Sequence, residues 1–248
     1  MPSQLICRPE QSLPVAVLKV TGVLDLPTSE TLRHAVCACL STQPEALLID
    51  VSGLEVRDPV ALDVLSDVVA GTAQWPAAPI VLCSGGPAIA GQLAASKAHD
   101  CVALTGSRAE ALARAVPAAR PHPIRARLSP VPDACRQARQ LVAQACAAWH
   151  LTDLTAIVAL VATELVANVV RHAHTTMEFT VGLRDGRISL AVRDGSTALP
   201  RAVDAGLRDA GGRGLRLVRE LSDAWGVLPV PGGKVVWTTL AVGAPGVR

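Results

Sequence analysis

Three polar side chains recur at intervals of four residues within a stretch of the chain that is otherwise almost wholly apolar. They are Glu164, Asn168 and His172, and the stretch runs from Leu154 to Ala173. At helical spacing, residues four apart share a face, so the three form a polar line on a helix whose other faces are buried. Burying a carboxylate and an amide is unfavourable unless each has a partner. The line indicates either a site that opens onto this face or core polar groups with internal partners.

Two further motifs follow in the chain. Asp194-Gly195 comes at the end of a predicted strand, and Gly212-Arg213-Gly214-Leu215 opens a predicted helix. Each motif alone is weak, because Asp-Gly usually marks a turn and a glycine-rich stretch before a helix usually forms a cap or loop. The ordered set of all three motifs is much more specific.

The chemistry of this ordered set fits a nucleotide. Glycines let backbone N–H groups face phosphate oxygens at a helix N-terminus, and Arg213 can add positive charge. An amide or carboxylate oxygen on the long helix suits Mg²⁺, which prefers hard oxygen ligands and brings phosphates with it. A carboxylate at a strand end can accept a hydrogen bond from the exocyclic amine of adenine. The P-loop pattern GxxxxGK[ST] and a GxGxxG after a first strand are both absent from the sequence.

The composition excludes several other classes of function. The net charge of +2 gives no strong field towards nucleic acid or an acidic membrane, and four Trp, one Phe and no Tyr offer few stacking surfaces. His172 and His174 point apart on a helix, which disfavours a metal pair. Arginines near the middle of the chain are interpreted as solvated charges. We therefore expect no direct contact with nucleic acid and no membrane insertion.

The cysteines and the first residues favour a cytoplasmic protein. Seven cysteines are scattered mostly through apolar runs, as expected for reduced thiols that pack as small hydrophobic groups. The opening residues lack the pattern of a signal peptide, because Arg8, Pro9 and Glu10 interrupt them. The run at 154–170 approaches the length of a membrane span, yet it carries Glu164 and Asn168, so a buried globular helix is preferred.

The first half of the chain alternates between strand-like and helix-like stretches, which predicts an α/β domain with one central sheet. Thr28 and Ser29 are the cap candidates of its first helix. The predicted strands are Val15–Val20, Ala46–Val51, Ile80–Cys83 and Val102–Leu104, and the predicted helices are Leu32–Leu40, Pro59–Ala70, Pro87–Ala95 and Arg108–Val116.

A proline-rich segment divides the chain. Five of its 18 prolines and three arginines lie between Val116 and Pro132, which is typical of a domain boundary. We predict domains at 1–117 and 125–248, joined by a linker at 118–124. The second domain has helices before strands, which favours an α+β arrangement with helices on one face of a mixed sheet. Its predicted elements are helices Asp133–Trp149, Leu154–Ala173 and Leu215–Leu221 and strands Met177–Arg184, Ile188–Arg193 and Val235–Val242, with hairpin turns at Asp185-Gly186 and Gly232-Gly233.

With these motifs in order, residues from about 125 to 242 resemble the GHKL (Bergerat-type) ATPase domain, in the version found in anti-sigma factor serine kinases. The Glu164–Asn168 element is similar to the family's N box, Asp194-Gly195 to its first glycine box and Gly212–Leu215 to its second. The resemblance implies an α/β sandwich that binds ATP and Mg²⁺. Two departures are a shortened first glycine box, Asp194-Gly195-Ser196, and the replacement of a family threonine around Lys234 and Val235.

The resemblance also implies a role for each site residue. Glu164 is the expected catalytic base that orients or deprotonates a substrate serine, and Asn168 is the expected Mg²⁺ ligand. Asp194 with Gly195 contacts adenine. The remaining residues expected to bind the nucleotide are His172, Gly212, Arg213, Gly214 and Leu215.

The first half resembles a STAS domain of the anti-sigma factor antagonist type, a β-sheet with helices. The similar residues are Gly22–Asp25, Leu47–Leu54 and Asp58–Leu62. In the family, the helix after the Asp-Leu-Ser-like strand opens with Asp-Ser, and that serine is phosphorylated. Here the matching position is Pro59, which has no hydroxyl. Ser52 and Ser66 are nearby hydroxyls at other positions, so the resemblance implies a STAS domain without its acceptor.

Together the two resemblances imply a cytoplasmic regulator of transcription that works by partner switching. The kinase domain is expected to phosphorylate a serine on a separate STAS antagonist, to sequester a sigma factor, or both. Two alternatives stay open. One is a non-enzymatic, nucleotide-dependent or degenerate module that only sequesters partners. The other is a fragment of a sensor histidine kinase, which is disfavoured because no acceptor-histidine hairpin precedes the ATP domain. The oligomeric state is open, a homodimer included.

Overall fold

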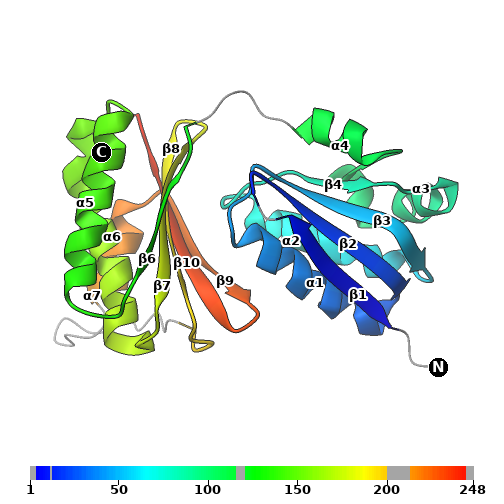
Figure 1. Ribbon diagram of the computed structural model, residues 1–248, viewed down its shortest axis with the longest axis horizontal. Helices are drawn as coiled ribbons and strands as arrows, with labels where there is room; N and C mark the ends of the chain where they lie inside the picture. Colours follow the sequence, from blue (N-terminus) through cyan, green and yellow to red (C-terminus); the bar gives the residue numbers. More distant parts are fainter. Residues whose placement is uncertain (1–3, 12, 116–120, 200–212, 244–248) are drawn as a thin grey trace. The chain divides into compact units, whose positions relative to one another are not determined.

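The computed structural model of the chain describes residues 4–11, 13–115, 121–199 and 213–243. The chain divides into two compact units, Met1–Ala118 and Ala119–Arg248, which we call the N-terminal unit and the C-terminal unit. Each unit has its own five-stranded sheet with helices packed against it (Figure 1). The mixed α/β architecture predicted from the sequence is present in both.

The sheet of the N-terminal unit is mostly parallel. Its strands follow the order β1-β2-β3-β4-β5; β1 pairs antiparallel with β2, and the other pairs are parallel. Strand β1 was not predicted from the sequence, because it buries only one of its seven residues and so shows almost no alternation. The strand bounds are β1 Leu5–Gln11, β2 Val15–Leu24, β3 Ala46–Val56, β4 Ile80–Cys83 and β5 Ala103–Thr105.

Helices cover this sheet because its buried strands are apolar on both faces. From α4, Ala111 and Ala115 pack against Val15, Leu48 and Val81. Figure 1 shows α1 and α2 lying together beside the sheet. The helical bounds are α1 Leu26–Leu40, η1 Pro59–Leu62, α2 Asp63–Thr72, α3 Pro87–Ala94, η2 Lys97–Asp100 and α4 Arg108–Ala115.

The first helix begins earlier than predicted, because its cap is Asp25 rather than Thr28 or Ser29. The Asp25 carboxylate accepts the Thr28 N–H at 3.1 Å, and the Thr28 hydroxyl accepts the Asp25 N–H at 3.0 Å. This reciprocal pair is a capping box, in which Thr28 fills the third helical position instead of the cap. The prediction of the helix was confirmed and that of its cap was wrong.

The helix predicted at Pro59–Ala70 consists of two pieces. A short 3₁₀ segment, η1, starts at Pro59, and α2 follows from Asp63. The Asp58 side chain accepts the Val60 N–H at 2.9 Å. Pro59 occupies the first position of the turn, where a missing N–H costs nothing because it would have no partner.

The cysteines of the structure are free thiols. Burial, with a smaller contribution from the neighbouring Cys7, raises the pKa of Cys39 to about 11. Because the thiolate is the reactive form of cysteine, a raised pKa suits a passive core side chain. Cys101, by contrast, is exposed.

The sheet of the C-terminal unit is antiparallel in every pairing, with the order β6-β7-β8-β10-β9. Helices α5, α6 and α7 lie on one of its faces (Figure 1). Between helices and sheet lies a core that includes Val142, Leu165, Phe179, Leu190 and Val218. The bounds are β6 Ile124–Leu128, α5 Asp133–Ala148, η3 Thr152–Leu154, α6 Thr155–Asn168, η4 Val169–Ala173, β7 Met177–Arg184, β8 Arg187–Asp194, α7 Arg213–Leu221, β9 Ala224–Val230 and β10 Gly233–Ala241.

Several predicted elements of this unit were confirmed, and some were incomplete. Strand β7 has the predicted bounds, and Asp185-Gly186 forms the turn with positive φ at both residues, 50° and 72°, as a type I′ hairpin requires. Strand β6 was missed, because it lies in the segment rich in proline and arginine that predicted only a boundary. The second hairpin turns at Pro231-Gly232, one residue earlier than predicted.

The long apolar helix changes from α-helical to π-helical geometry near its end, so the predicted line of three polar residues on one face is not correct along its whole length. Helix α6 ends at Asn168, and a π-helical turn, η4, continues from Val169 to Ala173. Glu164 and Asn168 are half-buried, whereas His172 lies in the π turn and is exposed. A π turn has more residues per turn than an α-helix and often marks a functional site. The line therefore holds for Glu164 and Asn168 and breaks before His172.

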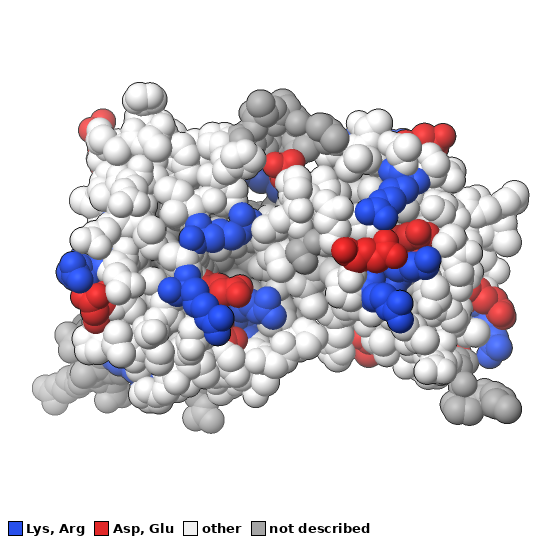
Figure 2. Space-filling view, viewed as in Figure 1, with Lys and Arg blue, Asp and Glu red and all other residues white. Residues whose placement is uncertain are grey.

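The stretch Thr152–Ala173 is the one helical segment among the described residues that is long and apolar enough to cross a membrane. This criterion concerns length and composition only, and core helices of soluble proteins meet it too. In the structure, Val158, Val161 and Leu165 of this stretch are buried in the core of the C-terminal unit. Charges of both signs are interspersed on the face shown in Figure 2, without a continuous basic field.

Candidate nucleotide site

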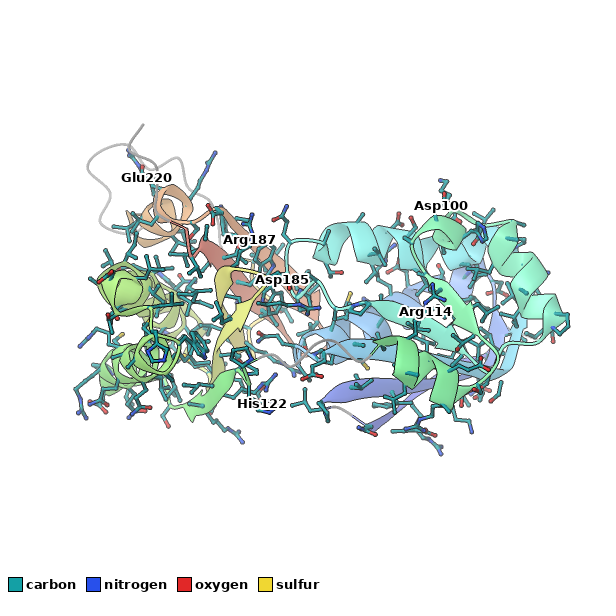
Figure 3. All side chains as sticks on the ribbon, turned by 90° about the horizontal axis from the view of Figure 1, so that it is seen from above. Asp100, Arg114, His122, Asp185, Arg187 and Glu220 are labelled. Atoms are coloured by element: carbon teal, nitrogen blue, oxygen red, sulfur yellow. The ribbon has the colours of Figure 1, made fainter. Side chains whose placement is uncertain are left out.

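Four element ends meet at one end of the C-terminal sheet. Because β7, β8 and β10 are antiparallel, the start of β7, the end of β8 and the start of β10 lie together, as the pairs Glu178–Arg193 and Asp194–Lys234 show. The Thr175 hydroxyl, just after helix η4, accepts the Gly195 N–H at 3.0 Å. The hairpin turn that carries Asp185 and precedes Arg187, both labelled in Figure 3, is at the opposite end of β7 and β8.

Asp194 is placed by the alternation of β8. Ile188, Leu190 and Val192 face the helices and belong to the core, and Asp194 is the next residue of that row. It is 4 % exposed. One of its carboxylate oxygens, Oδ1, accepts the Ser196 N–H at 2.8 Å and a Lys234 ammonium hydrogen at 2.9 Å. The other oxygen, Oδ2, is buried and has no hydrogen-bond partner among the described residues.

Lys234 is the site residue that the sequence analysis did not assign. It sits directly opposite Asp194 in the β8–β10 ladder and is itself 4 % exposed. Its Nζ also donates to the Ser196 carbonyl oxygen at 3.0 Å. A signal was available in the sequence: Lys234 shares the helix-facing parity of Val236 and Leu240, so it is a lysine at an inward position of an apolar strand.

Glu164 lies against the start of helix α7, so the first and third motifs meet in space. A Cβ atom added at Gly214 would overlap the Glu164 carboxylate, so a larger residue there would require the Glu164 side chain to shift. The side chain of Glu164 is 24 % exposed, and its Oε2 lies 3.5 Å from the Arg171 guanidinium. Helix α7 is anchored through Val218, which is buried in the core. The carboxylate thus faces a helix N-terminus and retains access to solvent.

The other predicted site residues are placed as follows. Asn168 ends α6, and its side chain makes no hydrogen bond to another residue in the described part of the chain. Gly214 and Leu215 are in the first turn of α7, and Gly195 is exposed just beyond β8. Gly212 and the Arg213 side chain lie outside the described residues. The roles of all these residues, His172 included, stay predictions.

Cys135 on helix α5 is near the Glu164 end of the site. Burial raises the pKa of its thiol, while the positive charges of Arg139 and Arg171 oppose the rise and the Glu164 carboxylate adds to it. The Cys135 thiol also contacts the Thr163 carbonyl oxygen at 4.0 Å. A raised pKa keeps this cysteine protonated, so it is no nucleophile beside the carboxylate.

The donors and acceptors left open here fit an adenine nucleotide with Mg²⁺. A buried carboxylate oxygen without a partner costs about 1–3 kcal/mol, and such orphans call for a specific explanation. Asp194 Oδ2 supplies the acceptor that an exocyclic amine needs. Asn168 offers an unengaged amide oxygen of the kind Mg²⁺ prefers. The N–H groups at the start of α7 suit phosphate oxygens. Among the described residues no cluster of three His, Cys, Asp or Glu side chains could hold a metal by itself.

Residues 128–240 match the family described as the histidine kinase-like ATPase domain. The C-terminal unit contains a histidine kinase-like ATPase domain. The match extends from the last residue of β6 to the end of β10 and so includes every element of the site. Such a domain is a kinase-type ATPase fold, and this family implies ATP binding.

Among solved structures, the chain is similar to an anti-sigma factor antagonist from Mycobacterium paratuberculosis, with 24 % identity, a TM-score of 0.39, and coverage of 46 % of this chain and 97 % of that one. It is similar to a STAS domain protein from Planctomyces limnophilus, with 17 % identity, a TM-score of 0.35, and coverage of 44 % and 97 %. It is also similar to the histidine kinase domain of the blue-light activated histidine kinase from Erythrobacter litoralis EL346, with 19 % identity, a TM-score of 0.30, and coverage of 37 % and 46 %. No curated protein matches the chain.

For the N-terminal unit, a STAS-like fold stays the expectation that the sequence resemblance gives. Its own strand order and the helix start at Pro59 agree with the resemblance seen in the sequence. The ATPase domain expected in the second half is confirmed by the family match at residues 128–240, and the STAS half of the expected fusion stays a prediction. The absent hydroxyl at Pro59 remains the departure of the N-terminal unit.

Proposed function

We propose that this chain is a cytoplasmic regulator of transcription that acts by partner switching. Its C-terminal unit binds ATP and Mg²⁺ and transfers the γ-phosphoryl group to a serine of a separate STAS antagonist, sequesters a sigma factor, or does both. One observation carries the proposal: among the described residues, one oxygen of the buried Asp194 carboxylate has no partner, at the end of the sheet where Glu164 meets the start of α7. A purely structural carboxylate would have both oxygens satisfied.

Each residue of the site has a part in this proposal. Asp194 Oδ2 accepts a hydrogen bond from the adenine amino group, and the backbone at Gly214 and Leu215 donates to phosphate oxygens. Asn168 holds Mg²⁺, which when bound neutralises charge on the phosphates. Glu164 accepts the hydrogen of the incoming serine hydroxyl, and its partial exposure leaves room for that hydroxyl.

The N-terminal unit has a different part. Pro59 provides no hydroxyl at the position where antagonists of the STAS family carry a serine, so this unit is not the acceptor. We assign it a fixed antagonist-like surface that docks on the kinase domain or on a partner. Covalent linkage raises the effective concentration of such docking to roughly millimolar for a short flexible tether.

A second candidate is a module that binds nucleotide and sequesters partners without catalysis. It is favoured by one contact: the Glu164 carboxylate is engaged by Arg171 at 3.5 Å, which competes with a substrate hydroxyl. The ion pair is half-exposed, and such pairs contribute only about 0–1 kcal/mol. A bound substrate can therefore displace Arg171 at small cost, and we favour the kinase.

The test uses the full chain, ATP labelled at the γ-phosphate, Mg²⁺ and a panel of STAS proteins that carry the family serine. We expect label on at least one of these proteins, and none on its Ser→Ala variant. Calorimetry with ATP and Mg²⁺ is run on the same sample. Binding without transfer to any STAS protein selects the sequestering module, and a folded sample that binds no ATP overturns both candidates.

A further inference from the structure

Lys234 has a donor that the structure leaves unused. An ammonium group has three N–H bonds. In Lys234 one points to Asp194 Oδ1 at 2.9 Å and one to the Ser196 carbonyl oxygen at 3.0 Å. Among the described residues no third acceptor is present. Because Lys234 is 4 % exposed, solvent does not readily satisfy the third N–H.

A counter-ion role for Lys234 explains only part of this arrangement. A lysine kept to neutralise a buried aspartate would account for the bond to Oδ1. It does not account for the other carboxylate oxygen, Oδ2, which is buried and has no partner in the part of the chain that the structure describes. With respect to the described residues, the cross-strand pair thus has one free acceptor on Asp194 and one free donor on Lys234, which lie directly opposite each other in the ladder.

The second bond of Lys234 explains how this pair is held in place. Nζ bridges strand β10 to the Ser196 carbonyl in the segment after β8, while the Ser196 N–H binds Asp194 Oδ1. Both hydrogen bonds to Oδ1 therefore hold the carboxylate in one orientation. Because its rotation is restrained, Oδ2 and the remaining N–H of Lys234 can bind the same ligand.

An acceptor beside a donor is complementary to one edge of adenine. That edge presents the amino group at C6, which donates, next to ring nitrogen N1, which accepts. We infer that Lys234 is a base-reading residue that donates its third N–H to adenine N1 while Asp194 Oδ2 accepts from the amino group. Guanine presents an acceptor, O6, and a donor, N1–H, in the reverse order, so the same pair disfavours it. The inference rests on the proposed binding of ATP.

The test changes single atoms of the ligand and leaves the protein intact. Calorimetry on the full chain with Mg²⁺ compares ATP with 1-deaza-ATP, in which N1 is replaced by C–H. The control ligand is 7-deaza-ATP, in which the same replacement is made at the other side of the purine. Loss of one hydrogen bond from a charged donor predicts roughly 10- to 100-fold weaker binding of 1-deaza-ATP. We expect 7-deaza-ATP to bind like ATP.

A protein variant then assigns the effect to Lys234. In Lys234→Met we expect weaker ATP binding and a ratio of ATP to 1-deaza-ATP affinity close to one, because the donor is gone from both complexes. The ligand comparison in the unmodified chain decides the inference even where this variant does not fold. Equal binding of ATP and 1-deaza-ATP overturns it, as does an equal loss for 7-deaza-ATP, or discrimination that survives in Lys234→Met.

These outcomes are separate from failure of the proposed function. If the folded chain binds no ATP, the proposed function falls and the reading of adenine by Lys234 falls with it. If ATP binds and the deaza analogues do not differ, only the role of Lys234 is overturned. If 1-deaza-ATP alone binds weakly and no STAS protein is phosphorylated, the role of Lys234 stands while the kinase proposal is replaced by the sequestering module.

Discussion

The two units of the chain use one local motif for different purposes. In the N-terminal unit, Asp58 Oδ1 accepts the N–H of Val60, two residues on, at 2.9 Å. In the C-terminal unit, Asp194 Oδ1 accepts the N–H of Ser196, also two residues on, at 2.8 Å. Asp58 follows strand β3, and Asp194 is the last residue of strand β8. Asp58 is half-buried, whereas Asp194 is buried and has one oxygen without a partner among the residues that the structure describes.

The difference shows that the aspartate turn by itself says nothing about function. Water can solvate the second oxygen of Asp58, so a turn cap explains that residue fully. The Asp194 side chain lies beside Lys234 and is only 1 % exposed to water. Its second oxygen therefore either binds a ligand or lowers the stability of the fold. Burial distinguishes the site from the turn, and the following experiments test that distinction.

The largest effect is expected at Glu164, whose carboxylate lies against the start of helix α7. Glu164→Gln removes the base and keeps the shape of the side chain, so phosphoryl transfer to a STAS protein should fall by about 10²–10⁴-fold. ATP binding should change little. Glu178→Gln, at an exposed position on β7, is the matched control.

Transfer of labelled phosphate measures the rate, and calorimetry measures ATP binding in the same variants. Transfer at the unmodified rate in Glu164→Gln would assign Glu164 a structural role. In that case the chemical difference between the two units would be confined to nucleotide binding.

The next effect compares the two aspartates directly. In Asp194→Asn the amide oxygen can keep the bonds to Lys234 and Ser196, which turns an N–H₂ donor towards the position of Oδ2. A donor facing the amino group of adenine should weaken ATP binding by roughly 10- to 100-fold. Asp58→Asn should leave ATP binding unchanged, because asparagine caps a turn about as well as aspartate.

Calorimetric titration of ATP into both variants gives this comparison. An Asp194→Asn chain that binds ATP as tightly as the unmodified protein would reduce Asp194 to a counter-ion of Lys234. The contrast between a site aspartate and a turn aspartate would then disappear.

Two helical glycines provide a smaller effect of the same kind. In Gly214→Ala the new Cβ would overlap the Glu164 carboxylate, so we expect phosphoryl transfer to fall about tenfold, since the base is displaced and not removed. Gly91→Ala in α3 meets open space and should raise stability by about 0.5–1 kcal/mol, as alanine does in a helix. Transfer assays and thermal unfolding measure the two outcomes.

If Gly214→Ala transfers phosphate normally, the close approach of α7 to Glu164 has no bearing on catalysis. If Gly91→Ala proves equally harmful, the effect at Gly214 is a general consequence of replacing glycine in a helix.

Local sequence signals predicted much of the fold, and long-range pairing accounts for what was missed. Strand β7 and its Asp185-Gly186 turn follow from alternation and turn chemistry, which act within a few residues. Strand β6 is an edge strand in an arginine- and proline-containing segment, so only its pairing with β7 reveals it. The π turn after Asn168 follows an apolar sequence that reads equally well as α-helix.

The candidate site shows the same division. Asp194 and Glu164 were identified from residue type and order along the chain. That Gly214 touches Glu164, and that Lys234 pairs with Asp194, depends on the packing of α7 on α6 and on the register of β10 against β8. Neither arrangement has a local signature. The register of β10 against β8 could still have been inferred from Lys234, which occupies a core-facing position of its strand. A core-facing lysine needs a buried carboxylate nearby.

The smallest effect concerns Pro59, where the N-terminal unit lacks the group that the kinase proposal requires. Pro59→Ser restores a hydroxyl at the first position of η1, a position that serine tolerates, and Asp58 still accepts the Val60 N–H. We expect labelled ATP and Mg²⁺ to place phosphate on Ser at position 59 in a minority of chains, within one chain or between chains. The unmodified chain should carry none there, and mass spectrometry locates the label.

Phosphate on Ser52 or Ser66 of the unmodified chain would contradict the loss of the acceptor. If the variant stays unlabelled while an external STAS protein is phosphorylated, the N-terminal unit does not present this loop to the kinase site. Its fixed surface then serves another partner, and the two units differ in what they bind as well as in what their aspartates do.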